Sequence, residues 1–116
     1  MKSFDLEERT ANFGESVIKF CRGLKQDAVS KPVISQLVRS ATSIGANYME
    51  ANAASSRKDF RNKIFICKKE SQETKHWLRM IANCAPENKE SARRLWQECQ
   101  ELTLIFGKIV SSLNKK

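Results

Sequence analysis

Residues 56–86 read SRKDFRNKIFICKKESQETKHWLRMIANCAP, and this stretch decides the fold. A stripe of apolar and small residues runs through it at helical spacing, and its members are Phe60, Ile64, Cys67, Ser71, Thr74, Leu78 and Ile81. Ser56, with Asp59 three residues later, is typical of a helix N-terminus, and Pro86 ends the pattern because proline interrupts helical hydrogen bonding. The stretch predicts one long helix that buries a single face.

Three other segments show the same periodicity. The first begins near Asp5, whose D-x-x-E match with Glu8 resembles a capping arrangement, and ends by GLKQDAVSKP. The second has Pro32 in its first turn, where a missing N–H costs nothing, and fades in EANAASS. The last follows Pro86. Their buried faces are expected to carry Leu6, Phe13, Val17, Phe20 and Leu24, then Ile34, Leu37, Val38, Ala41, Ile44 and Tyr48, and finally Leu95, Cys99, Leu102, Phe106, Ile109 and Leu113.

Short connections between four helices predict an all-α fold, an antiparallel up-and-down four-helix bundle. The chain has two prolines, four glycines and no block of alternating β-branched residues, and its 116 residues suit a single domain over residues 1–116. No apolar run approaches the ~20 residues of a membrane span, and the N-terminal segment turns polar where a signal peptide would be apolar. We therefore expect a cytoplasmic protein that does not bind a membrane.

The four cysteines, Cys21, Cys67, Cys84 and Cys99, are far apart and form no C-x-x-C pair. Metal binding and disulfide formation are two possible roles, but at least two of these residues lie on apolar helix faces. We expect buried thiols that pack as small hydrophobic residues.

The positive charge is concentrated in the third helix. The formal net charge is +8, and residues 54–84 hold eight Lys or Arg against three Asp or Glu. Beside the buried stripe lies a basic ridge, which consists of Arg57, Lys58, Arg61, Lys68, Lys75 and Arg79. Such a ridge is either a solvated face or a surface that binds phosphates. No helix-turn-helix, zinc-finger or RNP-like pattern accompanies it, so binding to nucleic acid would be backbone-directed, salt-sensitive and weakly sequence-specific.

A third face of the same helix mixes large apolar and charged side chains. Its members are Ile66, Glu70, Glu73, His76, Trp77 and Met80. A bundle with one core gives this face no partner inside the chain, and an exposed apolar surface indicates association. We expect an oligomer interface here, in which Glu70 and Glu73 make intersubunit ion pairs or hydrogen bonds.

Glu73 and His76 also form a Glu-x-x-His pair, the spacing of metal ligands in di-iron bundles. A complete di-iron site needs two such motifs and two further glutamates, whereas this chain has one histidine. No evident base and orienting group accompany a nucleophilic serine. We expect no metal, no cofactor and no enzymatic activity.

The second helix carries a polar stripe opposite its apolar one. This stripe consists of Gln36, Arg39, Ser43, Asn47 and Glu50. Ser and Asn are poor choices for a helix that merely faces water. Two interpretations stay open, an ordinary exposed face or a hydrogen-bonded contact with another helix or subunit.

A longer composite pattern spans residues 39–78, RSATSIGANYMEANAASSRKDFRNKIFICKKESQETKHWL. The second helix contributes R-S-x-x-S-I-x-x-N-x-x-E, and the third contributes D-F and K-E-x-x-E-T-x-x-W-L. In this pattern the chain resembles the bacterial four-helix-bundle proteins encoded within intervening sequences of 23S ribosomal RNA genes. It departs from the commoner form after Glu50, where ANAASS replaces a glycine-containing E-G turn, and the second helix is expected to extend slightly.

The resemblance implies a bundle that assembles as a homopentamer around a central opening. It also implies similarity to the accessory proteins of diversity-generating retroelements, which use a basic pentameric surface to engage a reverse transcriptase and nucleic acid. No catalytic residues belong to the family pattern. Our hypothesis is a non-enzymatic pentamer whose basic ridge binds RNA or DNA, and the alternative is a protein-interaction scaffold or adaptor without a direct nucleic-acid function.

Overall fold

The second and third helices begin where side chains accept hydrogen bonds from the first backbone N–H groups. In the computed structural model, which describes residues 6–114, the Oγ of Ser56 accepts a hydrogen bond from the backbone N–H of Asp59 at 3.0 Å. The predicted start of the long third helix is therefore confirmed. At the second helix, the Oδ1 of Asp27 accepts from the N–H groups of Val29 at 2.9 Å and Ser30 at 2.8 Å, and these bonds lower the pKa of Asp27. The predicted start of the first helix at Asp5 lies outside the described residues.

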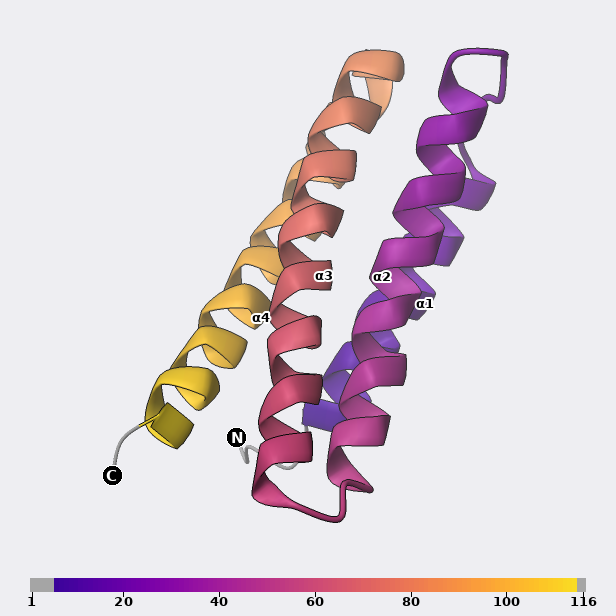
Figure 1. Cartoon of the computed structure of the whole chain (residues 1–116). Helices are drawn as coiled ribbons and strands as arrows, with labels where there is room; N and C mark the ends of the chain where they lie inside the picture. The colour runs from indigo at the N-terminus through magenta and orange to yellow at the C-terminus, as the bar shows by residue number, and fades with distance from the viewer. Residues whose placement is uncertain (1–5, 115–116) are drawn as a thin grey trace.

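Residues 6–114 form four α-helices and no strand, which confirms the predicted all-α bundle (Figure 1). The elements are α1 Leu6–Arg22, α2 Ser30–Asn52, α3 Arg57–Cys84, the 3₁₀ turn η2 Pro86–Asn88 and α4 Lys89–Asn114. Consecutive helices run in opposite directions along the bundle, as the colours of Figure 1 show. α2 continues past Glu50 to Asn52, and Pro32 lies in its first turn as predicted.

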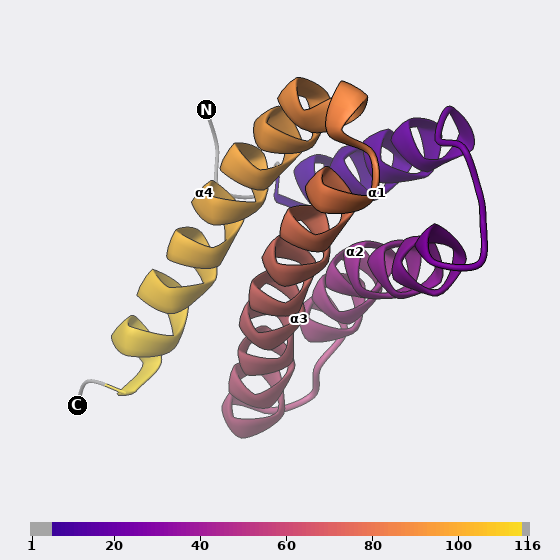
Figure 2. The ribbon, with the colours of Figure 1, turned by 90° about the horizontal axis from the view of Figure 1, so that it is seen from above.

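α3 lies between α2 and α4, and α1 completes the bundle by contacting both α2 and α4 (Figure 2). An ion-pair cluster joins α1 to α4. Arg9 donates from Nε to Glu98 Oε2 at 2.7 Å and from Nη2 to Glu101 Oε1 at 2.7 Å. The bond to Glu98 raises the pKa of Arg9 above its ordinary value. α3 therefore has a neighbouring helix on each side, α2 on one and α4 on the other.

The predicted buried faces meet in one core. The largest fully buried side chains are Phe106, Leu37, Ile44, Ile64, Leu78, Ile81 and Leu102. Six side chains predicted for the core are only half-buried, namely Phe20, Val38, Phe60, Leu95, Ile109 and Leu113. The buried hydroxyls of Ser71 and Thr103 each donate to a carbonyl of their own helix at 2.8 Å, so their polar atoms are satisfied inside the core.

Three of the four cysteines are buried free thiols, as predicted, and Cys84 is half-buried. Cys67 donates from Sγ to the Ile44 carbonyl of α2 at 3.6 Å, and Cys99 donates to the Ser71 carbonyl of α3 at 3.1 Å. Burial raises the pKa of Cys21 to about 11 and the pKa values of Cys67 and Cys99 to about 12. Cys67 and Cys99 therefore link neighbouring helices through uncharged thiols.

None of the helices within residues 6–114 combines the length and the apolar character that crossing a membrane requires.

Candidate nucleic-acid interface

The basic ridge predicted on α3 lies beside α4. At the start of α3, Arg57 donates from Nη2 to the Leu113 carbonyl at 2.9 Å, and Arg61 donates from Nε to Asn114 Oδ1 at 2.7 Å. Lys58 is exposed. Both arginines therefore lie against the end of α4 while their charged groups stay near the surface.

The same arrangement continues along α3. Lys75 donates from Nζ to Gln100 Oε1 at 2.5 Å, and its ammonium lies 5.4 Å from the centre of the Trp96 ring, within the range of a cation–π contact. Lys68 lies against Gly107, where its Cε is 3.9 Å from the position that a Cβ would take. The absence of a side chain at Gly107 leaves room for the lysine chain to lie across α4.

The partners just described are neutral, so none of them offsets the positive charge of the ridge. Within residues 6–114, the ion pairs involve only the cations Arg9, Arg39 and Lys63, and none of these belongs to the ridge. A carbonyl, an amide oxygen or an aromatic ring accepts a hydrogen bond or a cation without cancelling its charge. The ridge therefore presents positive charges that form no ion pair with a carboxylate of residues 6–114.

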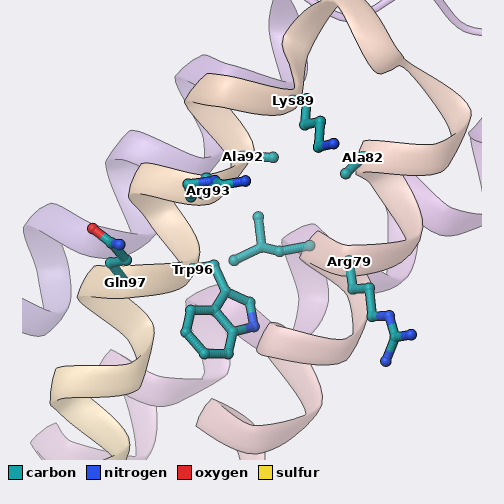
Figure 3. Close-up of a pocket in the computed structure, with 8 residues that line it drawn as sticks. Arg79, Ala82, Lys89, Ala92, Arg93, Trp96 and Gln97 are labelled. Atoms are coloured by element: carbon teal, nitrogen blue, oxygen red, sulfur yellow. The ribbon is translucent and has the colours of Figure 1, made fainter.

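Two cavities lie along the groove between α3 and α4, and the ridge forms one wall of both. The first has a volume of about 390 Å³, and its lining includes Leu78, Arg79, Lys89, Arg93 and Trp96 (Figure 3). The second has a volume of about 470 Å³, and its lining includes Lys68, Lys75, Thr103, Gly107 and Lys108. No acidic side chain lines either cavity. We call this surface, together with Arg57 and Arg61, the α3–α4 groove.

Sequence reasoning missed the α4 side of this groove, which contributes Lys89, Arg93, Trp96 and Lys108. A signal for it was present, because Lys89, Arg93 and Trp96 follow one another at steps of four and three residues and so share a helix face. This face of α4 forms one site with the ridge because the fold places α4 beside α3. The site is therefore a groove with two basic walls instead of a ridge on one helix.

The third face of α3, predicted as an oligomer interface, is less open than expected. Only His76 is exposed, whereas Ile66, Trp77 and Met80 are half-buried and the indole of Trp77 packs against the core. The ring of His76 meets that of Trp77 edge-on, with 4.9 Å between centroids. The large apolar side chains that the structure exposes most lie elsewhere, at Ile18, Val29, Met49, Phe65, Trp96 and Leu104. Oligomer formation through the third face stays a prediction.

The expectation that this face has no partner inside the chain is wrong for Glu70 and Glu73. Arg39 of α2 donates from Nη2 to Glu73 Oε1 at 2.5 Å and from Nη1 to Glu70 Oε1 at 3.4 Å. The bond from Arg39 lowers the pKa of Glu73, while burial raises the pKa of Glu70. Within the chain, these carboxylates fasten α3 to α2.

The polar stripe on α2 is in part a contact with another helix, because two of its five members form ion pairs with α3. Glu50 makes a second contact of this kind, in which it accepts a hydrogen bond from the Nζ of Lys63 on α3 at 2.7 Å. Ser43 and Asn47 instead bond to carbonyls of α2 itself, at 2.7 Å and 2.9 Å. The stripe therefore combines contacts to α3 with local hydrogen bonds.

The Glu-x-x-His pair is divided between two different contacts, since Glu73 binds Arg39 and His76 contacts Trp77. Within the described range, no three His, Cys, Asp or Glu side chains lie together in a way that could hold a metal ion. The indole Nε1 of Trp77 is buried and has no acceptor among the described residues.

The fold and the groove define a class, that of small basic four-helix bundles. The chain matches the family described as 23S rRNA-intervening sequence protein over residues 2–108 and belongs to that family. It is also similar to a crystal structure of a protein of unknown function from the S23 ribosomal protein family of Bacteroides thetaiotaomicron. The two share 28% identity with a TM-score of 0.79, over 90% of this chain and 96% of that chain. The comparison with curated proteins finds no match.

Family membership confirms the resemblance drawn from residues 39–78. The relation to the accessory proteins of diversity-generating retroelements stays a prediction.

Proposed function

We propose that this chain binds RNA or DNA through the α3–α4 groove and does not act as an enzyme. The observation that carries the proposal is the charge of this groove, where cations from two helices face a surface that no acidic side chain lines. Phosphate oxygens satisfy such cations, and binding releases the counterions condensed on the nucleic acid. Lys58 at the exposed start of α3 adds to the same field.

The arrangement favours contacts to the nucleic-acid backbone. Arg57, Arg61 and Lys75 are held in place by bonds to α4, so the loss of side-chain entropy on binding a phosphate is smaller than for mobile surface lysines. The groove follows two straight antiparallel helices (Figure 1), which suits a run of phosphates along one strand. We expect low sequence specificity and strong dependence on salt.

An electrophoretic shift tests this proposal, with structured RNA and duplex DNA each titrated over a series of salt concentrations. The affinity should fall log-linearly with salt, with a slope of about −0.9 per duplex phosphate contacted and about −0.7 per single-strand phosphate. The double variant Arg61→Glu, Lys68→Glu should bind about 100-fold more weakly at low salt, because two attractive contacts become repulsive.

The matched control is Lys25→Glu, Lys31→Glu. It changes the net charge by the same amount at two exposed positions outside the groove. Retained binding by this control shows that location matters as well as total charge. Equal losses in both double variants, or an affinity indifferent to salt, would contradict the proposed site.

We also propose that the chain works as a homo-oligomer, with a pentamer as the family resemblance implies. The support from the chain itself is the third face, where His76 is exposed and the apolar side chains of Ile66 and Met80 are only half-buried. Light scattering on the purified protein measures the subunit number. A monomeric mass over the concentration range of the shift experiment would overturn this part of the proposal and leave nucleic-acid binding to be judged separately.

A second candidate function, a protein adaptor, is favoured by the groove between α1 and α2. This cavity of about 320 Å³ is lined by Ile18, Met49, Glu7 and Glu15 among others, and no cation lines it. Ile18 and Met49 are among the exposed large apolar side chains. The charge and the apolar surface fit an amphipathic helix of a partner protein with basic residues flanking its apolar face. A partner captured after nuclease treatment, and lost in Ile18→Asp, Met49→Asp, supports this function, while an unchanged capture contradicts it.

A further inference from the structure

The first cavity of the α3–α4 groove differs from the rest of the groove in its composition. Its floor is apolar and includes Leu78. The side chains of Lys89 and Arg93 point toward the cavity, and Arg79 lies at its edge with the guanidinium directed away (Figure 3). Phosphate binding alone needs only the cations. An apolar floor beside cations suits a ligand that brings an apolar or aromatic group together with negative charge.

Trp96 forms the wall of this cavity. Its side chain is 38% exposed, although a tryptophan of a small bundle gains most by burying its whole ring. Lys75 places its ammonium 5.4 Å from the ring centre, so the indole already serves as a contact surface within the groove. Trp96 of α4 and Leu78 of α3 line the same cavity.

We propose that this cavity binds one unpaired base of a single strand, stacked against Trp96, while neighbouring phosphates contact Arg79, Lys89 and Arg93. The inference rests on the proposed function and adds the kind of nucleic acid that it selects. The cavity volume of about 390 Å³ lies in the range of sites for small ligands and is ample for a nucleobase. Aromatic side chains beside a cationic track are the usual means by which proteins hold single strands.

The remainder of the strand follows the groove. The second cavity continues along the same two helices and brings Lys68, Lys75 and Lys108 to its lining. Lys75 joins the two cavities, because it lines the second and its ammonium lies over the ring of Trp96, which lines the first. A duplex cannot use the base site, because its bases are paired and stacked inside the helix.

The experiment compares a single-stranded oligo(dT) of about ten nucleotides with a duplex of the same length, within the site sizes typical of single-strand binders. Binding is measured by fluorescence anisotropy, and the emission of Trp96 is followed in a Trp77→Phe background, where Trp96 is the remaining tryptophan. The single strand should quench Trp96 and the duplex should not. Trp96→Ala should weaken binding of the single strand about tenfold and leave binding of the duplex unchanged, and Trp96→Phe should retain most of the affinity.

The outcomes separate this inference from the proposed function. If both probes bind but Trp96→Ala holds the single strand as tightly as the unmodified chain, the base site is wrong and the proposed function stands. Equal quenching by single strand and duplex also overturns the base site. If neither probe binds at low salt and the structured RNA gives no shift either, the proposed function itself fails. Thermal unfolding of Trp96→Ala followed by circular dichroism verifies that the variant is folded, as expected for a partly exposed side chain.

Discussion

The two flanks of α3 use charged side chains in opposite ways. Toward α2, Arg39 binds Glu70 and Glu73, so that carboxylates offset its positive charge. Toward α4, Arg57 and Arg61 bond to a carbonyl and an amide oxygen and keep their charge. Both flanks join helices, but the first carries cations paired with carboxylates and the second forms a positively charged groove. The difference identifies the flank that is able to attract an external anion.

The largest expected effect comes from reversing one charge on each flank. Arg39→Glu places a third carboxylate beside Glu70 and Glu73, of which Glu70 has a side chain only 13% exposed. The free energy of unfolding should fall by about 2 kcal/mol, since the buried carboxylate loses its cation and gains a like charge. Arg79→Glu, the matched change on the other flank, should alter it by less than about 0.5 kcal/mol because Arg79 is exposed. Urea unfolding of both variants measures the difference, and equal losses would end the distinction between the flanks.

A smaller effect is expected from removing a hydroxyl on each flank. The Oγ1 of Thr74 lies 2.8 Å from the Oγ of Ser40 on α2, in the buried part of the α2–α3 contact. Thr74→Val should lower the free energy of unfolding by about 1.5 kcal/mol, because Ser40 loses a cross-helix partner.

Thr103→Val is the matched control. The Thr103 hydroxyl bonds to the Cys99 carbonyl of its own helix, so its loss strands no side chain of a neighbouring helix. We expect a change of less than about 0.5 kcal/mol. If Thr103→Val costs as much as Thr74→Val in thermal or urea unfolding, the cross-helix hydrogen bond is not what distinguishes the two positions.

The thiols of Cys67 and Cys99 test whether the α2–α3 and α3–α4 contacts bury their side chains equally well, whatever their difference in charge. Burial raises the pKa values of Cys67 and Cys99 to about 12, so in alkali the unfolded chain, with thiols near pKa ~8.5, loses these protons first. The stability that each thiol contributes is therefore complete below about pH 8.5 and declines as the pH rises toward the folded-state pKa. Between about pH 8.5 and 9.5 the loss should be smaller by about 1 kcal/mol in Cys99→Ala than in the unmodified chain.

Cys67→Ala should flatten the alkaline decline to a similar extent, since its thiol also bonds to a neighbouring helix. Cys84→Ala should leave the decline unchanged, because Cys84 is only half-buried. Urea unfolding at a series of pH values checks all three variants. Rapid reaction of more than one thiol of the folded chain with a soluble disulfide reagent would show that the packing around the thiols is looser than the structure indicates.

The smallest effect is expected for Trp77→Phe. The variant removes the buried Nε1 that has no acceptor among the described residues and keeps most of the aromatic ring. The unfavourable burial of a donor and the lost contacts of the larger ring should nearly balance, and the free energy of unfolding should change by less than about 0.5 kcal/mol. A loss of oligomer in light scattering, with unchanged unfolding of the chain, would show instead that the larger ring of Trp77 takes part in subunit association.

Much of the fold was predictable because it depends on local patterns. The periodic stripe of residues 56–86, the N-cap at Ser56 and the break at Pro86 each act within a few residues and each agree with the structure. Helical periodicity also separated the ridge on α3 from its buried face. These features are settled by spacing along one chain segment.

The site was only half predictable, because it is formed by two helices. A helical wheel of α3 gives the relative directions of its own side chains. It does not show that Arg79 lines a cavity together with Lys89 and Arg93 of α4. Nor does it show that Arg39 of α2 binds the carboxylates of the third face. The same wheel treats Trp77 as surface, whereas packing against the core leaves it half-buried. Which neighbour covers which flank is decided by the packing of the whole bundle.

The cations of the α3–α4 groove also repel one another, since the two helices hold them side by side without carboxylates between them. The folded chain therefore carries a self-repulsion that added salt or a polyanion relieves, and either should raise its melting temperature. A heat-resistant redesign would begin by placing glutamates on α4 opposite the ridge. The same glutamates would form permanent ion pairs with the groove cations. A gain in thermal tolerance would therefore come with a loss of affinity for anions.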